Sequence, residues 1–229
     1  NELLTRQQAA SLMSMGIAHE IKNPLGMMLS KIARLRENPA DAELTLKTID
    51  TIGRMVDRLN TVLNNMLTIT TEKRETFNLA SLCEEVSQAI QTSCDDKNII
   101  LKTMVLDSKL VGDTTQLYQV LINLAKNSIE AMPNGGTLSI TSEPSMYRNK
   151  DQQLVSGIKL VVADTGTGIP PDIQSKIFDA YFSHGKYQST GLGLSIVLQI
   201  IDQHGGMIDF TSVPHQGSSF FVYLPLPEP

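Results

Sequence analysis

The sequence predicts a two-part fold: an α-helical hairpin that pairs into a dimeric four-helix bundle, and then an α+β sandwich with a mixed sheet and helices on one face. Over about the first 70 of the 229 residues, apolar side chains recur at steps of three and four, the period of amphipathic helices. After about Lys73, short apolar strands alternate with helices that carry capping signals. We therefore expect two domains, residues 1–72 and 73–229.

The expected hairpin has two apolar stripes separated by a break at residues 37–40. The second stripe alternates steps of three and four as a heptad seam does. A hairpin alone cannot bury both stripes, so we expect a homodimer through residues 1–71. The stripe positions are Ile17, Ile21, Leu25, Met28, Ile32 and Leu35, followed by Ile49, Ile52, Val56, Leu59, Leu63 and Met66.

Local signals place the elements of the second domain. Asn78 is a candidate N-cap for a helix that runs to about Cys94, and a capping box at 113–116 predicts a helix to about Met132. A helix over 192–204 is expected to stop at the two glycines that follow it. Strands are expected at 99–101, 104–105, 137–141, 154–163, 207–213 and 218–224.

Composition narrows the class of protein. The net charge of −5 gives no general case for a nucleic-acid partner. No apolar run approaches the ~20 residues of a membrane span.

Cys83 and Cys94 fall roughly 16 Å apart along one expected helix, which is too far for a disulfide. This spacing predicts reduced thiols in the cytoplasm. The chain begins at Asn1 inside a helical pattern, so we expect a piece of a longer protein, in which upstream segments could reach a membrane.

A histidine beside a glutamate stands out in the first helix. Glu20 is placed to accept from one ring N–H of His19, which would fix the tautomer and leave the other nitrogen as a nucleophile. Asn23 lies one turn further on the same face, and Pro24 removes a backbone hydrogen bond there. Asn23 also stands where a zinc protease has its second histidine, which argues against a metal site. The alternative is an ordinary surface or packing histidine.

Two stretches of the second domain carry groups that suit a nucleotide. Asn123 and Asn127 share a helix face, and their amide oxygens are hard ligands that suit Mg²⁺; a plain polar helix face is the alternative. Asp164 ends an apolar strand, where a buried carboxylate can accept from an exocyclic amine such as N6 of adenine. Gly166 and Gly168 follow it and allow close backbone approach, although an ordinary tight turn has the same pattern.

A glycine-containing run at residues 189–195 leads into the last helix. Its free N–H groups and the helix dipole would face an anion. The run is not a Walker A loop, because no Gly-Lys-Ser/Thr follows, and it lacks the third glycine of a Rossmann fingerprint. Lys186 is a candidate phosphate contact, although a lysine in a polar loop is more often simply solvated.

The order of these motifs resembles that of bacterial two-component sensor histidine kinases over essentially the whole chain. Thr165 departs from the pattern, since Asn is usual there, and Lys186 is shifted relative to the common loop. The matching motifs are the H-box HEIKNPL at 19–25, the N-box LINLAKNSIEA at 121–131, the G1-box DTGTGIP at 164–170, the F-box IFDAYF at 177–182 and the G2-box STGLGLSIV at 189–197.

The resemblance implies a protein histidine kinase that uses ATP and Mg²⁺. His19 would be phosphorylated with Glu20 as its acid–base partner, and the phosphoryl group would pass to an aspartate of a response-regulator receiver domain. Asn23 would position water for phosphatase activity toward that regulator. Asn127 would be the Mg²⁺ ligand. The residues implied at the nucleotide are Asn123, Asn127, Asp164, Gly166, Gly168, Lys186, Thr190, Gly191, Leu192 and Gly193.

Two other classes of function compete with this interpretation. A nucleotide-binding ATPase of the chaperone or topoisomerase type would have the same superfold, but it would carry a water-activating glutamate where this chain has Asn123. A non-catalytic dimerisation scaffold would not need His19, Glu20, Asn127 and Asp164 together. We therefore expect the kinase.

Overall fold

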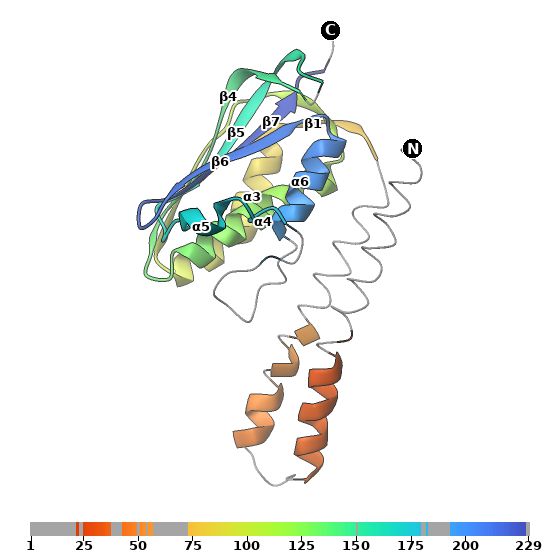
Figure 1. Ribbon diagram of the computed structural model, residues 1–229, viewed down its shortest axis with the longest axis vertical. Coiled ribbons are helices and arrows are strands. Elements are labelled where there is room, and N and C mark those ends of the chain that lie inside the picture. The colour runs from red at the N-terminus through yellow and green to blue at the C-terminus, as the bar shows by residue number, and fades with distance from the viewer. Residues whose placement is uncertain are drawn as a thin grey trace. The chain divides into compact units, whose positions relative to one another are not determined.

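The structure is a computed structural model that describes residues 22, 25–37, 43–49, 51–53, 55–56, 73–149, 151–179, 182 and 193–227. The chain divides into two compact units, Asn1–Thr70 and Thr71–Pro229. The elements of both units can be followed in Figure 1.

The described part of the first unit is helical on both sides of the expected break. Residues 25–37 form one helical stretch, and residues 43–49, 51–53 and 55–56 are helical after it. Met28 is buried, whereas Leu25, Ile32, Ile49 and Val56 are exposed. Part of each apolar stripe therefore stays uncovered in the single chain. The stripe positions Ile17, Ile21, Leu59, Leu63 and Met66 lie outside the described residues.

The second unit is built on a five-stranded sheet with the strand order β2-β4-β5-β7-β6. Strand β2 runs parallel to β4, and every other neighbouring pair is antiparallel, so the sheet is mixed as predicted. The strands are β2 (Ile99–Met104), β4 (Gly136–Arg148), β5 (Leu154–Asp164), β6 (Met207–Val213) and β7 (Gly217–Pro225).

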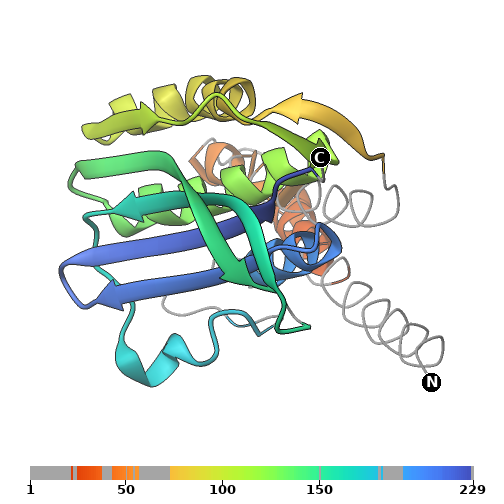
Figure 2. The same cartoon turned by 90° about the horizontal axis from the view of Figure 1, so that it is seen from above.

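Helices α3 (Leu79–Asp96), α4 (Thr114–Ala131) and α6 (Gly193–Gln203) cover one face of this sheet, as Figure 2 shows, which confirms the expected layering. Helix α4 lies between α3 and α6 and packs against β4, β5 and β7. Alternate residues of the strands face the helices and form one core, to which Leu124 and Phe220 belong. A short helix, α5 (Pro171–Gln174), follows β5.

Side-chain caps fix where α3 and α4 begin. Asn78 Oδ1 accepts from the Ser81 N–H over 3.1 Å, and Asp113 Oδ1 accepts from the Gln116 N–H over 3.1 Å. Both helices therefore start where the sequence predicts. In a capping box the Gln116 side chain would accept from the Asp113 N–H. Here that N–H donates instead to Nε2 of His204 over 3.0 Å.

Strands β1 (Glu75–Asn78) and β3 (Lys109–Gly112) form a separate two-stranded sheet that the sequence did not predict. Each has four residues, too few for an alternating pattern. Strand β4 is also longer than predicted and continues through Pro144. Because β2 pairs with β4 only as far as Thr141, the missing N–H of Pro144 faces no neighbouring strand.

Cys83 and Cys94 are both buried and form no disulfide with each other, as their spacing along one helix predicts. Burial raises the pKa of the Cys83 thiol to about 12. Among the helices that the structure describes, none is long and apolar enough to cross a membrane.

Candidate functional site

Asp164, the last residue of β5, is 7% exposed and holds a carboxylate inside the helix-covered side of the domain. Its Oδ1 accepts from the Gly166 N–H over 2.8 Å and from the Ser218 N–H over 3.2 Å. Its Oδ2 accepts from the Ser128 hydroxyl over 3.2 Å. Burial raises the pKa of Asp164, and the hydrogen bonds oppose that shift. Because each oxygen can accept about two hydrogen bonds, Oδ2 keeps one position for a ligand.

Glycine is required where the chain passes close to Asp164. Gly217 has a φ of +93°, and a Cβ on it would lie 1.9 Å from the carbonyl oxygen of Asp164. Gly168 has a φ of +66°, and a Cβ on it would lie 2.2 Å from the carbonyl oxygen of Val213. Any side chain at either position would push the loop after β5 away from the β6–β7 turn.

Hydrogen bonds hold the loop after β5 against the β6–β7 turn. The Ile169 N–H donates to the Ser212 hydroxyl over 2.7 Å, and the His215 N–H donates to the Thr167 carbonyl over 2.7 Å. Gln174 of α5 donates from Nε2 to the Ile169 carbonyl over 2.9 Å. The G1-box therefore has a fixed course as far as α5.

Thr165, which stands where Asn is usual in this motif, has a defined role inside this loop. Its hydroxyl accepts from the Thr137 N–H over 3.0 Å and donates to the sulfur of Met132 over 3.8 Å. The side chain therefore ties the loop to β4 and to the residue that follows α4.

Asn123 and Asn127 lie on the same face of α4, which is a continuous helix through both positions. The Asn123 Nδ2 is buried and finds no hydrogen-bond partner within the described ranges. A buried amide donor without a partner is uncommon in folded proteins, and a bound ligand is one way to satisfy it. The residue after Asn127 is Ser128, so this end of α4 adjoins Asp164.

The fit of the site to a divalent cation depends on oxygen donors. Across the described residues, no group of three or more His, Cys, Asp or Glu side chains could hold a metal ion. A hard cation at the Asn127 amide would therefore need further oxygen ligands, which the phosphates of a bound nucleotide can supply.

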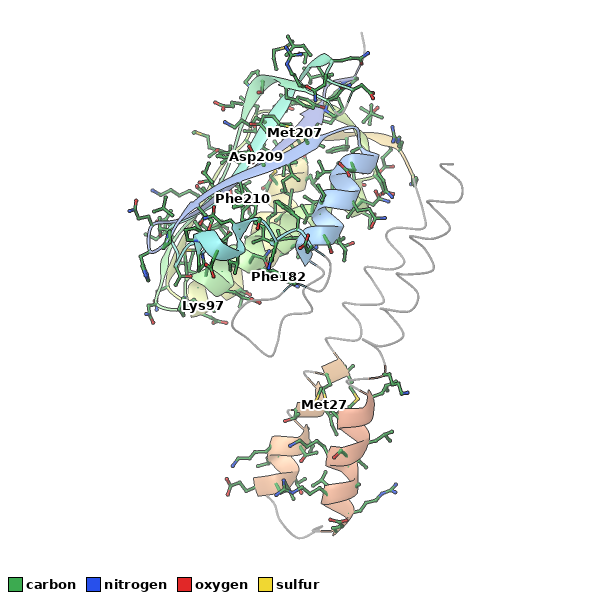
Figure 3. The ribbon with its side chains drawn as sticks, viewed as in Figure 1. Met27, Lys97, Phe182, Met207, Asp209 and Phe210 are labelled. Carbon is green, nitrogen blue, oxygen red and sulfur yellow. The ribbon has the colours of Figure 1, made fainter. Side chains whose placement is uncertain are left out.

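The F-box aromatics belong to the packing beside this site. The Phe178 and Phe210 rings meet edge to face with their centroids 5.9 Å apart. Phe182 and Phe210, labelled in Figure 3, both pack against the core. The described part of the F-box therefore acts as a hydrophobic support.

The structure brings Asp164, Gly166 and Gly168 together at the end of β5, next to the α4 helix that carries the two asparagines. Gly193 is the first residue of α6, and a Cβ there would meet nothing described within 4 Å. The other candidates, His19, Glu20, Asn23, Lys186, Thr190, Gly191 and Leu192, lie outside the described residues.

Sequence reasoning missed Ser128 and Ser218. Ser128 lies inside the N-box, where its place beside Asn127 was a weak signal. Ser218 gave no local signal, because its bond to Asp164 depends on the β5–β7 register that sets these two residues opposite each other.

Two family models match the chain. The His Kinase A (phospho-acceptor) domain matches residues 9–75. The domain described as Histidine kinase-, DNA gyrase B-, and HSP90-like ATPase matches residues 112–228, more than half of the chain, and this type of domain binds ATP.

Individual relatives agree with the family models. The chain is 34% identical over 227 residues to the sensory histidine kinase/phosphatase NtrB of Proteus hauseri, covering 96% of this chain and 64% of that protein. It is 30% identical over 234 residues to the sensor histidine kinase ZraS of Escherichia coli (strain K12), and the match covers 99% of this chain and 48% of that protein.

A solved structure of the histidine kinase ThkA in complex with the response regulator protein TrrA is 30% identical, with a TM-score of 0.75, and the match covers 97% of this chain and 64% of that one. The chain thus spans less than two thirds of each of these three proteins.

Proposed function

This chain belongs to the two-component sensor histidine kinases, and on that basis we propose that it is the catalytic core of such a kinase. The proposed enzyme is an ATP:protein-L-histidine phosphotransferase. It catalyses ATP-dependent autophosphorylation of a histidine and passes the phosphoryl group to an aspartate of a response regulator in signal transduction.

The observation that carries this proposal is the environment of Asp164. A buried, ionised carboxylate can only accept hydrogen bonds, so it selects a ligand with a donor. The open position on Oδ2 suits the exocyclic amine of adenine, while Oδ1 is already filled by the N–H groups of Gly166 and Ser218. The family model over residues 112–228 supports the same assignment.

We assign residues 1–72 to dimerisation and histidine phosphotransfer and residues 73–229 to ATP binding and catalysis. The exposed apolar side chains of the first unit, among them Leu25, Ile32 and Ile49, support a homodimer, since a second hairpin would cover them. ATP and response regulators act in the cytoplasm, so we place this chain there.

The described residues fit Mg²⁺ through Asn127, with Asn123 beside it and phosphate oxygens completing the ligand set. Bound Mg²⁺ would neutralise charge on the phosphates during transfer. We assign contacts with the nucleotide phosphates to Lys186, Thr190, Gly191, Leu192 and Gly193. Chelation of Mg²⁺ should weaken ATP binding to the natural chain and have little effect on Asn127→Ala.

His19 has the central chemical role. Glu20 accepts from one ring N–H, and the other ring nitrogen attacks the γ-phosphorus of ATP in line. The new N–P bond forms as the bond to the bridging oxygen breaks and ADP leaves. The phosphoryl group then moves from His19 to a carboxylate oxygen of the regulator, which regenerates the imidazole. In the proposed phosphatase activity, Asn23 orients a water that hydrolyses the aspartyl phosphate of the response regulator.

Incubation with γ-labelled ATP and Mg²⁺ tests the assignment. The natural chain should acquire an acid-labile label, and His19→Gln should acquire none. His215→Asn is the matched control, because His215 is exposed at a φ of +63° that Asn tolerates, and it should be labelled normally. Acid-stable label, or label on His19→Gln, would contradict the proposal. Steady phosphate release without protein label would instead indicate an ATPase, and absence of nucleotide binding a scaffold.

A further inference from the structure

The hydroxyl of Ser128 in α4 holds a carboxylate of another element. Ser128 is 1% exposed, and its Oγ donates to Oδ2 of Asp164, 36 positions further along the sequence. Ser87 of α3 donates to the carbonyl of Cys83 in the preceding turn over 2.7 Å, and its hydroxyl also lies 2.8 Å from the hydroxyl of Thr103 on β2. Within the described residues Ser128 has no partner besides Asp164.

The Ser128 bond makes the two oxygens of Asp164 inequivalent. Oδ1 accepts from two backbone N–H groups, those of Gly166 and Ser218, so its capacity is filled. Oδ2 accepts from Ser128 alone and keeps one acceptor position. Donors on both oxygens also fix the plane of the carboxylate, which fixes the direction of the open position.

A proton on Asp164 would have to sit on Oδ2, the oxygen with spare capacity. A protonated Oδ2 would donate to a purine with an oxo group at position 6, whereas an ionised Oδ2 accepts from a purine with an amino group there. Burial favours the protonated form, and the Ser128 hydroxyl donates to the oxygen in its ionised form and opposes protonation.

We propose that Ser128 is a positioning residue for base selection: its hydroxyl holds Asp164 as an oriented acceptor and so favours a 6-aminopurine nucleotide over a 6-oxopurine nucleotide. This inference rests on the proposed function, because it requires the base of the nucleotide to meet Asp164.

Calorimetric titration of the whole chain with ADP and with inosine diphosphate tests the inference without phosphoryl transfer. Ser128→Ala removes the hydroxyl, and Ser128→Cys keeps nearly the same volume but is only a weak donor. Loss of a hydrogen bond to a charged group should raise the Kd of ADP about tenfold in both variants. The Kd of inosine diphosphate should change less, so the preference for ADP should fall several-fold. Ser87→Ala is the matched control and should keep the natural preference.

Three results would overturn the inference alone. The Kd of ADP could be unchanged in Ser128→Ala, or the Kd of both nucleotides could rise equally. Ser128→Cys could also keep the preference of the natural chain for ADP, which would show that the side-chain volume and not the hydroxyl matters. A natural chain that binds neither nucleotide would overturn the proposed function together with the inference. The two failures are therefore distinguishable.

Discussion

The backbone N–H of Asp113 donates to Nε2 of His204 over 3.0 Å, which joins the N-cap of α4 to the residue after α6. Since Nε2 accepts, the ring proton must be on Nδ1, which donates to the Ile200 carbonyl over 2.8 Å. The Asp113 carboxylate also accepts from the Lys73 N–H, at the start of the second unit, over 3.0 Å. One buried neutral histidine therefore connects the ends of both helices that carry candidate nucleotide residues.

Replacing this histidine should cost much of the stability of the second unit. His204→Ala would leave the buried Asp113 N–H without its acceptor and would open a cavity. We expect the free energy of unfolding to fall by about 2–4 kcal/mol, measured by urea denaturation. His215→Asn changes an exposed histidine and should stay within about 0.5 kcal/mol of the natural chain. An equally small change in His204→Ala would show that the connection is unimportant.

A methyl group at Gly168 should disturb the loop after β5. Gly168→Ala combines a φ of +66° with a Cβ placed 2.2 Å from the Val213 carbonyl oxygen. We expect a loss of about 2 kcal/mol or more, seen as a lower Tm, together with weaker nucleotide binding. Gly53→Ala is the control, because the new Cβ on that helical glycine would meet no described atom within 4 Å beyond its chain neighbours and its own helix backbone, and it should not lower the Tm. Identical behaviour of the two variants would contradict the expectation.

Nucleotide affinity should depend on the charge of Asp164. Burial raises the pKa of this carboxyl in the free protein. As the pH falls through the raised pKa, Asp164 gains a proton and loses its acceptor, so the Kd of ADP should rise by up to about tenfold per pH unit. The effect on folding has the opposite sign. Because the pKa of Asp164 is higher in the folded than in the unfolded chain, its contribution to the free energy of unfolding decreases as the pH rises through the folded-state pKa. Titration calorimetry between pH 7.5 and 4.5 measures the effect, and a flat profile would refute it.

The exposed stripe of the first unit should determine the oligomeric state. Ile49 and Ile100 are each 60% exposed in the single chain, but only Ile49 lies in the expected heptad seam. Ile49→Glu should therefore convert a dimer to a monomer in sedimentation experiments, since a charge would be buried between helices. Ile100→Glu, on the edge strand β2, should leave the dimer intact. Dissociation by both substitutions, or by neither, would argue against this interface.

The sequence by itself determined the features that depend on neighbours a few positions away. Asn78 and Asp113 cap α3 and α4 through N–H groups three residues further on, so the starts of both helices could be predicted. Gly205, with a φ of +68°, similarly marked the end of α6. The order of the nucleotide motifs could also be predicted, because each motif is contiguous.

Only the tertiary structure decided which groups meet Asp164. Ser128 and Ser218 are 36 and 54 positions away from it, and they reach it through the packing of α4 on β5 and the register of β7. The partnership of Asp113 with His204 spans 91 positions in the same way. Such contacts leave no local pattern, because a serine or histidine in a helix has the same periodicity whether its hydrogen bond stays in that helix or crosses to another element.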